Sequence, residues 1–199
     1  MSVEAPTDPE ATVNETVGPI AAAIESGLLP GRVWVYSNYH CNLECAYCLT
    51  ESAPRSTRRI IGPEQMVAIA EQAAALGFKE VGVTGGEPFL RRDLPDIIVA
   101  MSEHLPVTVL TNGTLFGGDR LDALDVLVDR PVRFQISLDS PDPEPNDAMR
   151  GPLNYAKVVD AVPRMVGRGH TVRIATTVDE GDMMPDDQVR LCALHRSWG

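Results

Sequence analysis

Short β-branched runs alternate with longer amphipathic segments from residue 32 onward. This alternation is typical of βα units, in which each helix carries the chain back along one face of a parallel sheet. We predict five strands, at residues 33–37, 80–84, 107–111, 132–138 and 171–178. The sequence therefore predicts an α/β fold whose strands all run in the same direction.

The segments between these strands place apolar residues on one helical face, at the period of 3.6 residues. The predicted stripes are Met66, Ile69, Ala70 and Ala73; Leu94, Ile97, Ile98 and Met101; Leu121, Leu124 and Val128; and Tyr155, Val158, Val159, Val162 and Val166. Two further helices are predicted, a short one at residues 17–29 and another at residues 186–197. Pro163 is expected to kink the fourth striped helix, because proline removes an internal hydrogen bond.

The domain organisation is simple. Residues 1–15 contain Pro, Thr, Asp and Glu and little that could be buried, so we predict a flexible acidic tail. No internal repeat or low-complexity linker divides the remainder, and residues 16–199 are predicted to form one domain. A chain of 199 residues that is 44% hydrophobic is long and apolar enough to bury a sizeable core.

Charge and hydropathy argue against two classes of partner. The formal net charge of −11 disfavours nucleic acid, because nonspecific nucleic-acid binding depends on clustered Lys and Arg. No segment approaches the roughly 20 apolar residues of a membrane span, and no basic start followed by an apolar run indicates a secretory signal. We therefore expect a cytoplasmic protein without a nucleic-acid or membrane partner.

Three of the four cysteines lie within eight residues, in the run CNLECAYC that contains Cys41, Cys45 and Cys48. Such crowding suits a metal site in a reducing compartment better than a disulfide framework. Three thiolates leave one corner of an iron–sulfur cluster open, so that its iron can bind a substrate or cofactor. A zinc site completed by His40 is the alternative. Cys192 is predicted to be a packed helix residue.

Other unusual motifs directly follow the predicted strands, where ligands gather in parallel α/β proteins. GGEP follows the second strand, TNG ends the third and SLD ends the fourth. Glycines there allow a backbone to approach a ligand closely, although each motif alone also fits an ordinary turn or cap. The residues concerned are Gly85, Gly86, Glu87, Asn112, Ser137 and Asp139.

Taken in order, CNLECAYC, GGEP, TNG and SLD resemble the motifs of the radical SAM superfamily, over about residues 32–178. The resemblance implies a partial (βα) barrel of six units. Only five units are readable in this chain, and the sixth is missing. We therefore expect either a chain truncated at its C-terminal end or a partner that supplies the missing unit.

The resemblance also implies two cofactors, a 4Fe-4S cluster and S-adenosylmethionine. Cys41, Cys45 and Cys48 would bind three irons, and the fourth iron would chelate the amino and carboxylate groups of S-adenosylmethionine. One electron would then split the bond between sulfur and the ribose carbon, giving methionine and a 5′-deoxyadenosyl radical that abstracts hydrogen from a substrate. No side chain of the protein is assigned a catalytic role.

Two of the motifs are implied to hold the methionine and adenine parts of S-adenosylmethionine. Gly85, Gly86 and Glu87 would receive the methionine amino group, through the Glu87 carboxylate or the neighbouring carbonyls. Tyr47, which precedes the last cysteine, would lie against the adenine ring or, alternatively, merely fill the loop.

Four more residues are implied to face the same cavity. Asn112 points toward its mouth, and the Ser137 hydroxyl would bond the ribose or the methionine carboxylate. Asp139 would contact the ribose or orient its loop. Arg150 would pair with the cofactor carboxylate through its planar guanidinium, or it is a surface arginine at a helix start.

A basic patch follows the cysteine run and contains Arg55, Arg58 and Arg59. This patch would attract an anionic substrate or simply solvate the loop. We favour solvation.

Two functions from different classes remain open. The first is a radical SAM enzyme in cofactor or natural-product biosynthesis or in peptide maturation, with a small-molecule or peptide substrate and an electron donor such as flavodoxin or ferredoxin. The second is an inactive iron–sulfur or zinc module that acts as a partner subunit. Release of 5′-deoxyadenosine after reduction would separate the two.

Overall fold

A five-stranded parallel sheet forms the centre of the protein. The computed structural model describes residues 11–177 and 185–198. Neighbouring strands follow the chain order β1-β2-β3-β4-β5, and every pair is parallel. The strands are β1 (Arg32–Tyr36), β2 (Glu80–Thr84), β3 (Val107–Thr111), β4 (Val132–Ser137) and β5 (Thr171–Ala175). The five predicted strands and their common direction are therefore confirmed, although residue 178, where the fifth was predicted to end, lies outside the described residues.

The register gives the sheet two different faces. On one face, here called the outer face, paired residues of neighbouring strands lie side by side and are at most 4% exposed. These residues are Val35, Val83, Val109 and Phe134. Trp34, the residue before Val35, points to the opposite face and is 42% exposed. Since β-strand side chains alternate between faces, the apolar residues of the core all lie on the outer face.

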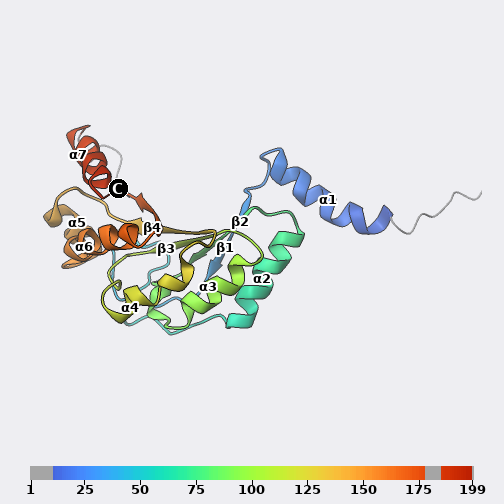
Figure 1. Ribbon diagram of the computed structural model, residues 1–199, viewed down its shortest axis with the longest axis horizontal. Helices are drawn as coiled ribbons and strands as arrows, with labels where there is room; N and C mark the ends of the chain where they lie inside the picture. Colours follow the sequence, from blue (N-terminus) through green and yellow to red (C-terminus); the bar gives the residue numbers. More distant parts are fainter. Residues whose placement is uncertain (1–10, 178–184, 199) are drawn as a thin grey trace, which may run out of the picture.

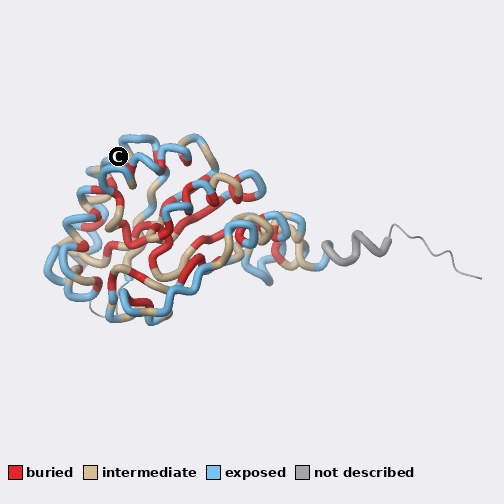
Figure 2. The backbone as a smooth tube through the Cα atoms, turned by 90° about the horizontal axis from the view of Figure 1, so that it is seen from below, coloured by how far each residue is buried: buried red, intermediate tan, exposed pale blue. Residues whose placement is uncertain are grey.

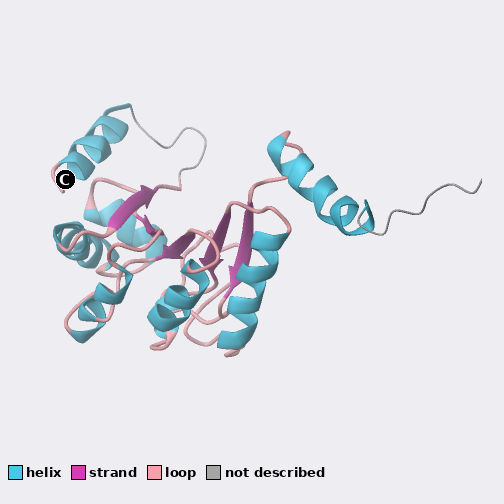
Figure 3. Ribbon diagram, turned by 45° about the vertical axis from the view of Figure 1, so that its right-hand side comes forward, coloured by secondary structure: helices cyan, strands magenta, loops and turns pink. Residues whose placement is uncertain are grey.

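Helices cover this outer face, as Figures 1 and 3 show. Figure 2 shows that the buried stretches are concentrated in the strands and in the helix sides that pack on them. The covering helices are α2 (Pro63–Ala75), α3 (Leu94–Ser102), α4 (Asp119–Asp122) and α6 (Asn154–Gly167). α6 runs through Pro163 without ending there.

The prediction of the third helix was partly wrong. Instead of one continuous helix, the chain forms the short α4 and then a 3-10 turn, η2 (Asp125–Leu127). Leu121, Leu124 and Leu127 are buried, whereas the predicted Val128 is only partly buried. A spacing of three residues suits the 3-10 helix, which has three residues per turn, and this explains the shift from Val128 to Leu127.

The first helix, α1 (Ala11–Glu25), begins earlier than predicted, inside the stretch that was predicted to be a flexible tail. α1 points away from the sheet in Figure 1. Residues 1–10 lie outside the described residues. The last helix, α7 (Pro185–Arg196), matches the predicted one, and its Leu191 packs into the core. No helix in the described part of the chain is long and apolar enough to cross a membrane.

His170, just before β5, is a buried titratable group in the core. Its ring packs edge-on against Phe134, with 5.4 Å between ring centroids, and its Nε2 atom has no hydrogen-bond partner. Burial lowers the pKa of His170; Asp125 opposes this shift and Arg168 adds to it. The neutral imidazole is therefore the form that the folded chain prefers.

We expect His170→Phe to reduce the loss of stability on acidification. The pKa of His170 is lower in the folded protein than its unfolded value of 6.5. The contribution of the neutral His170 side chain to the free energy of unfolding is therefore fully present above pH 6.5, and it is lost as the pH falls below that value. As the pH falls through this range, the melting temperature of the wild type should fall more than that of His170→Phe. His40 and His195 titrate in the same direction in both proteins, so only the difference reports on His170. Parallel melting curves would contradict the assignment.

Candidate functional site

A cavity of about 570 Å³ opens at the carboxyl ends of the strands. All three clustered cysteines line it, together with strand-end residues from β1 to β4. The predicted site residues in its wall are Cys41, Cys45, Tyr47, Cys48, Gly85, Gly86, Asn112, Ser137 and Arg150. Its size falls in the range of roughly 300–1,000 Å³ that small-molecule and cofactor sites occupy.

The cysteine loop is held in place mainly by backbone hydrogen bonds. The Cys41 N–H donates to the Ala53 carbonyl at 3.3 Å, which pins the beginning of the loop to the segment after it. The Ala46 N–H donates to the Met149 carbonyl at 3.0 Å, which attaches the middle of the loop to α5 (Pro143–Arg150). The three thiols therefore occupy fixed positions around one cavity.

The pKa values of the three thiols are shifted in different directions. Burial raises the pKa of Cys41 to about 11, and the Glu87 carboxylate and Cys45 add to the rise. Burial also raises the pKa of Cys45, although Arg150 opposes the shift. For Cys48, burial acts in the same direction, but hydrogen bonds from Thr50 and from backbone N–H groups outweigh it, so the pKa is lowered. Binding of a positively charged metal centre would favour the thiolate form of all three.

The donor set fits a cluster better than a single metal ion. Among residues 11–177 and 185–198, no group of three or more His, Cys, Asp or Glu side chains is arranged to hold one ion. The alternative zinc site of His40 with the three cysteines is therefore not found. Three thiols that line one cavity without converging on one point suit a larger centre, such as an iron–sulfur cluster, whose irons each take a separate thiolate.

Gly85 and Gly86 line the cavity at a turn where the backbone leaves no room for a larger residue. Gly85 has a φ of +153°, and a Cβ atom there would lie 2.4 Å from the Asn38 carbonyl oxygen. At Gly86 a Cβ atom would lie 2.1 Å from the His40 carbonyl oxygen and 3.0 Å from the Cys41 nitrogen. The glycines thus allow the turn after β2 to lie directly against the backbone that leads into the cysteines.

Glu87 does not face the cavity, contrary to its predicted role as a possible ligand for the methionine amino group. Its side chain is fully buried, and its carboxylate accepts three hydrogen bonds, from the Phe89 N–H at 3.0 Å, the Thr111 hydroxyl at 2.8 Å and the Asn112 N–H at 2.8 Å. Burial raises the pKa of Glu87, and these bonds oppose the rise. Glu87 therefore ties the end of β2 to the end of β3.

We expect Glu87→Gln to lower the free energy of unfolding by about 1–3 kcal/mol, the usual cost of leaving a buried polar group without a matching partner. An amide turns one acceptor into a donor, which must then face the Asn112 N–H or the pair formed by Phe89 and Thr111. Urea titration would measure the change, with the exposed Glu71→Gln on α2 as the matched control. Equal losses in both variants would contradict this role.

Two asparagines connect the glycine turn, the cysteine loop and β3. The Asn112 amide lies 3.7 Å from the Cys41 sulfur and donates to the Asn42 side chain at 3.0 Å. Asn38, which the sequence analysis missed, is fully buried and donates to the His40 and Glu87 carbonyls at 2.9 and 3.0 Å. An asparagine two residues after a strand resembles an ordinary turn residue, so nothing in the sequence alone distinguished it.

Tyr47, Asp139 and Arg150 form one largely buried network at the side of the cavity. The Tyr47 hydroxyl donates to the Asp139 carboxylate and accepts from Arg150, whose guanidinium also pairs with Asp139 at 3.1 Å. The side chains of Arg150 and Asp139 are only 7% and 5% exposed. Asp139 does not line the cavity; it accepts from the Thr177 N–H at 3.0 Å and thereby orients the loops, the second of its two predicted roles.

Arg150 is not the surface arginine that was the alternative. It is buried at the end of α5, lines the cavity, and its Nε atom has no hydrogen-bond partner. A guanidinium in a cavity wall is suited to an anionic group of a bound ligand.

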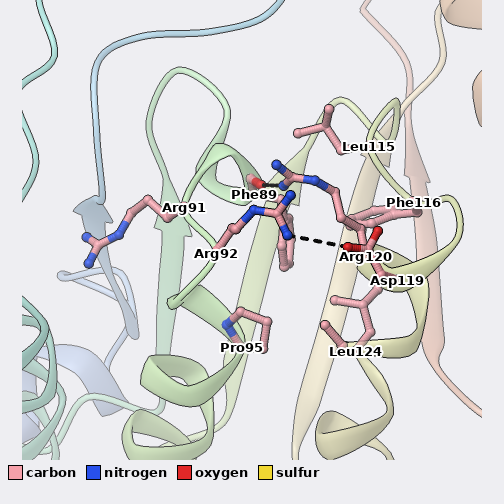
Figure 4. Close-up of a pocket in the computed structure, with 10 residues that line it drawn as sticks. Phe89, Arg91, Arg92, Pro95, Leu115, Phe116, Asp119, Arg120 and Leu124 are labelled. Carbon is pink, nitrogen blue, oxygen red and sulfur yellow. Dashed lines mark hydrogen bonds and ion pairs between the residues drawn. The ribbon is translucent and has the colours of Figure 1, made fainter.

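A second pocket lies between the segment that follows the glycine turn and the segment that contains α4, and it is drawn in Figure 4. Its volume is about 60 Å³, and its wall includes Phe89, Arg92, Phe116, Asp119 and Arg120. Figure 4 shows Arg92 turned toward Asp119, with which it forms an ion pair at 3.4 Å. A space of this size holds a few water molecules and excludes a nucleoside, so the larger cavity is the candidate site.

Comparison with protein families identifies the class. The family model of the radical SAM superfamily matches residues 35–190, and the chain belongs to this superfamily. Among curated relatives, GTP 3′,8-cyclase 1 of Mycobacterium tuberculosis is 31% identical over 153 residues, which cover 71% of this chain and 41% of that protein. The mycofactocin maturase MftC of Mycolicibacterium smegmatis is 32% identical over 137 residues, 67% of this chain and 33% of the maturase.

A solved structure confirms the fold. SuiB of Streptococcus suis, crystallised with S-adenosylmethionine, matches with a TM-score of 0.75 at 18% identity, over 98% of this chain and 45% of SuiB. The five-stranded sheet is thus part of the partial barrel of the superfamily, as predicted. The chain spans less than half the length of these relatives. The superfamily's cofactors are the predicted 4Fe-4S cluster and S-adenosylmethionine.

Proposed function

We propose that this chain is the core of a radical SAM enzyme of cofactor biosynthesis or peptide maturation. The observation that carries the proposal is the convergence of the three cysteines, the glycine turn and Arg150 on one cavity of about 570 Å³. The relatives named above are a cyclase and a maturase, which supports an enzyme rather than a binding module.

Different residues of this chain would hold the two cofactors. Cys41, Cys45 and Cys48 would hold the cluster. Gly85 and Gly86 would bring backbone groups to the methionine end of S-adenosylmethionine. When bound, these cofactors supply the one-electron cleavage that gives methionine and a 5′-deoxyadenosyl radical.

The remaining residues of the site would fix the position of S-adenosylmethionine. Tyr47, held by Asp139, would present its ring to the adenine, and Ser137 would offer its hydroxyl to the ribose or the carboxylate. Arg150 would pair with the carboxylate through its guanidinium, whose charge Asp139 partly balances. Glu87 contributes indirectly, by joining the ends of β2 and β3, and its bond from the Asn112 N–H holds Asn112 in the cavity wall.

Other parts of the proposal come from chemistry and composition. The substrate is a small molecule or a peptide, and the reaction is of the oxidoreductase or lyase type. The electron comes from a donor such as flavodoxin or ferredoxin. Three free cysteines that hold a cluster need a reducing compartment, so the cytoplasm is the proposed location.

The test is electron paramagnetic resonance of the anaerobically reconstituted and dithionite-reduced protein, combined with chromatography for 5′-deoxyadenosine. The proposal expects a cluster signal that changes when S-adenosylmethionine is added, and release of 5′-deoxyadenosine. A cluster signal that does not respond, with no release, would overturn the enzyme in favour of the inactive iron–sulfur module.

A further inference from the structure

An exposed surface next to the cysteine loop combines positive charge with apolar area. It comprises Tyr39, Arg58, Arg59 and Ile60, and we refer to it as the arginine surface. An isolated antiparallel bridge pairs Asn38 with Ile60, and the Ile61 N–H donates to the Ser37 carbonyl at 3.2 Å. The segment at residues 58–60 is therefore fixed against the segment that leads from β1 into the cysteines.

The bridge places this segment close to the chain that enters the cysteine motif. Asn38, one partner of the bridge, also donates to the His40 carbonyl at 2.9 Å. The charge of Arg58 contributes, after burial, to the lowered pKa of His40, so Arg58 lies near the residue that precedes Cys41. Tyr39, the member of the arginine surface that is nearest along the chain, stands two residues before the first cysteine of the cluster motif.

The charge of this surface is opposite to that of the whole chain. Arg58 and Arg59 are exposed, and neither forms an ion pair or side-chain hydrogen bond within residues 11–177 and 185–198. The chain has a formal net charge of −11. Tyr39 and Ile60, which are 43% and 54% exposed, add apolar area to this surface.

The arginine surface lies outside the cavity. None of its four residues belongs to the cavity wall, whereas Tyr36, on which the Tyr39 ring stacks at 5.8 Å, does. A small anionic substrate at the reacting centre would therefore not reach Arg58 or Arg59. A partner that approaches the cluster from outside the protein would meet them first.

We propose that the arginine surface docks an acidic one-electron carrier protein that reduces the cluster; this inference rests on the proposed function. An acidic carrier is repelled by most of this acidic chain and attracted to this one surface, which directs it to the cluster side. In the transfer, a flavodoxin hydroquinone gives one electron to the oxidised cluster and becomes the semiquinone. No bond forms or breaks in that step.

The test uses the cluster-loaded protein, with flavodoxin hydroquinone as the probe. The variant is the charge reversal R58E/R59E, and the control is K79E/R196E, which changes the net charge equally at exposed residues away from the cluster motif. Lys79 precedes β2 at the amino end of the sheet, and Arg196 ends α7. Flavodoxin affinity is measured by titration calorimetry, and cluster reduction is followed by stopped-flow absorbance.

The expected result is that R58E/R59E weakens flavodoxin binding and slows cluster reduction by about tenfold or more at low ionic strength, while K79E/R196E changes both much less. Added salt should bring the wild-type rate down toward that of the variant, since surface charges are screened. Photoreduced 5-deazariboflavin, a small uncharged reductant, should reduce both proteins equally. Unchanged flavodoxin affinity in R58E/R59E, or an equal loss in the control, would overturn the proposal.

The two proposals fail in different ways. If wild-type protein binds a cluster but releases no 5′-deoxyadenosine with dithionite, the proposed enzyme fails, whatever flavodoxin does. If 5′-deoxyadenosine is released but R58E/R59E binds flavodoxin like the wild type, only the docking surface fails. If R58E/R59E is also slow with 5-deazariboflavin, the arginines support the cofactor site itself and the docking proposal is wrong.

Discussion

Cys45→Ala is expected to abolish both the reduced-cluster signal in electron paramagnetic resonance and the release of 5′-deoxyadenosine. A cluster bound through three thiolates loses one of three protein ligands, and no other described cysteine lies in the cavity wall to replace it. Iron analysis and 5′-deoxyadenosine chromatography, on protein reconstituted in parallel with the wild type, would measure the loss.

The matched control is Cys192→Ala. Cys192 was predicted to be a packed helix residue, but it is exposed on α7 and lies outside the cavity. Its removal should therefore leave iron content and 5′-deoxyadenosine unchanged. The fold should survive both changes, because the Cys45 side chain is only partly buried and its one polar contact is a 3.7 Å approach to the Arg150 carbonyl. Melting curves would verify this. A Cys45→Ala protein that still binds the cluster would refute the assignment of Cys45 as a ligand.

The strands were predictable because their residues carry the signal themselves. β2 and β3 were predicted with the bounds that the structure gives them, since β-branched residues fill them and turn residues surround them. α5 was not predicted as a helix for the opposite reason. Its sequence, PEPNDAMR, has no apolar stripe, and its buried members are the polar Asn146 and Arg150. A helix that buries polar groups leaves no hydrophobic period to detect.

The cavity was predictable from the motifs, but the direction of individual side chains was not. Glu87 follows β2, where a carboxylate can face either a ligand or the protein interior. Its direction depends on Thr111 and Asn112, which supply the hydrogen bonds from the next strand end. Tyr47 likewise depends on Asp139 and Arg150, far along the chain. Pairings of this kind arise only when the sheet brings distant loops together.

The second large effect is expected at the glycine turn, where Gly86→Ala should lower the melting temperature by about 6–12 °C. This corresponds to about 3 kcal/mol, the upper part of the usual cost of overpacking a tight contact in a domain of this size. The new methyl group would lie 2.1 Å from the His40 carbonyl oxygen, and the atoms it meets belong to the backbone, which cannot rotate away as a side chain can. Differential scanning calorimetry would measure the shift.

The same substitution should weaken the cluster site more than its effect on stability alone predicts. To make room for the methyl group, the backbone at His40 and Cys41 must move outward, and Cys41 is one of the three proposed ligands. The Gly86 and Glu87 N–H groups donate to the Asn38 and His40 carbonyls at 2.9 and 3.0 Å, so the movement also strains these bonds.

Gly117→Ala is the matched control for Gly86→Ala, because nothing lies within 4 Å of a Cβ atom at Gly117. The control should keep the wild-type melting temperature to within a few degrees and should bind the same amount of iron. Gly86→Ala, assayed well below its own melting temperature, should bind substantially less iron than the control. If it melts early yet binds iron normally, the close approach of the turn to the cysteine loop serves folding alone. If both properties are normal, the contact between the turn and the loop is looser than the structure indicates.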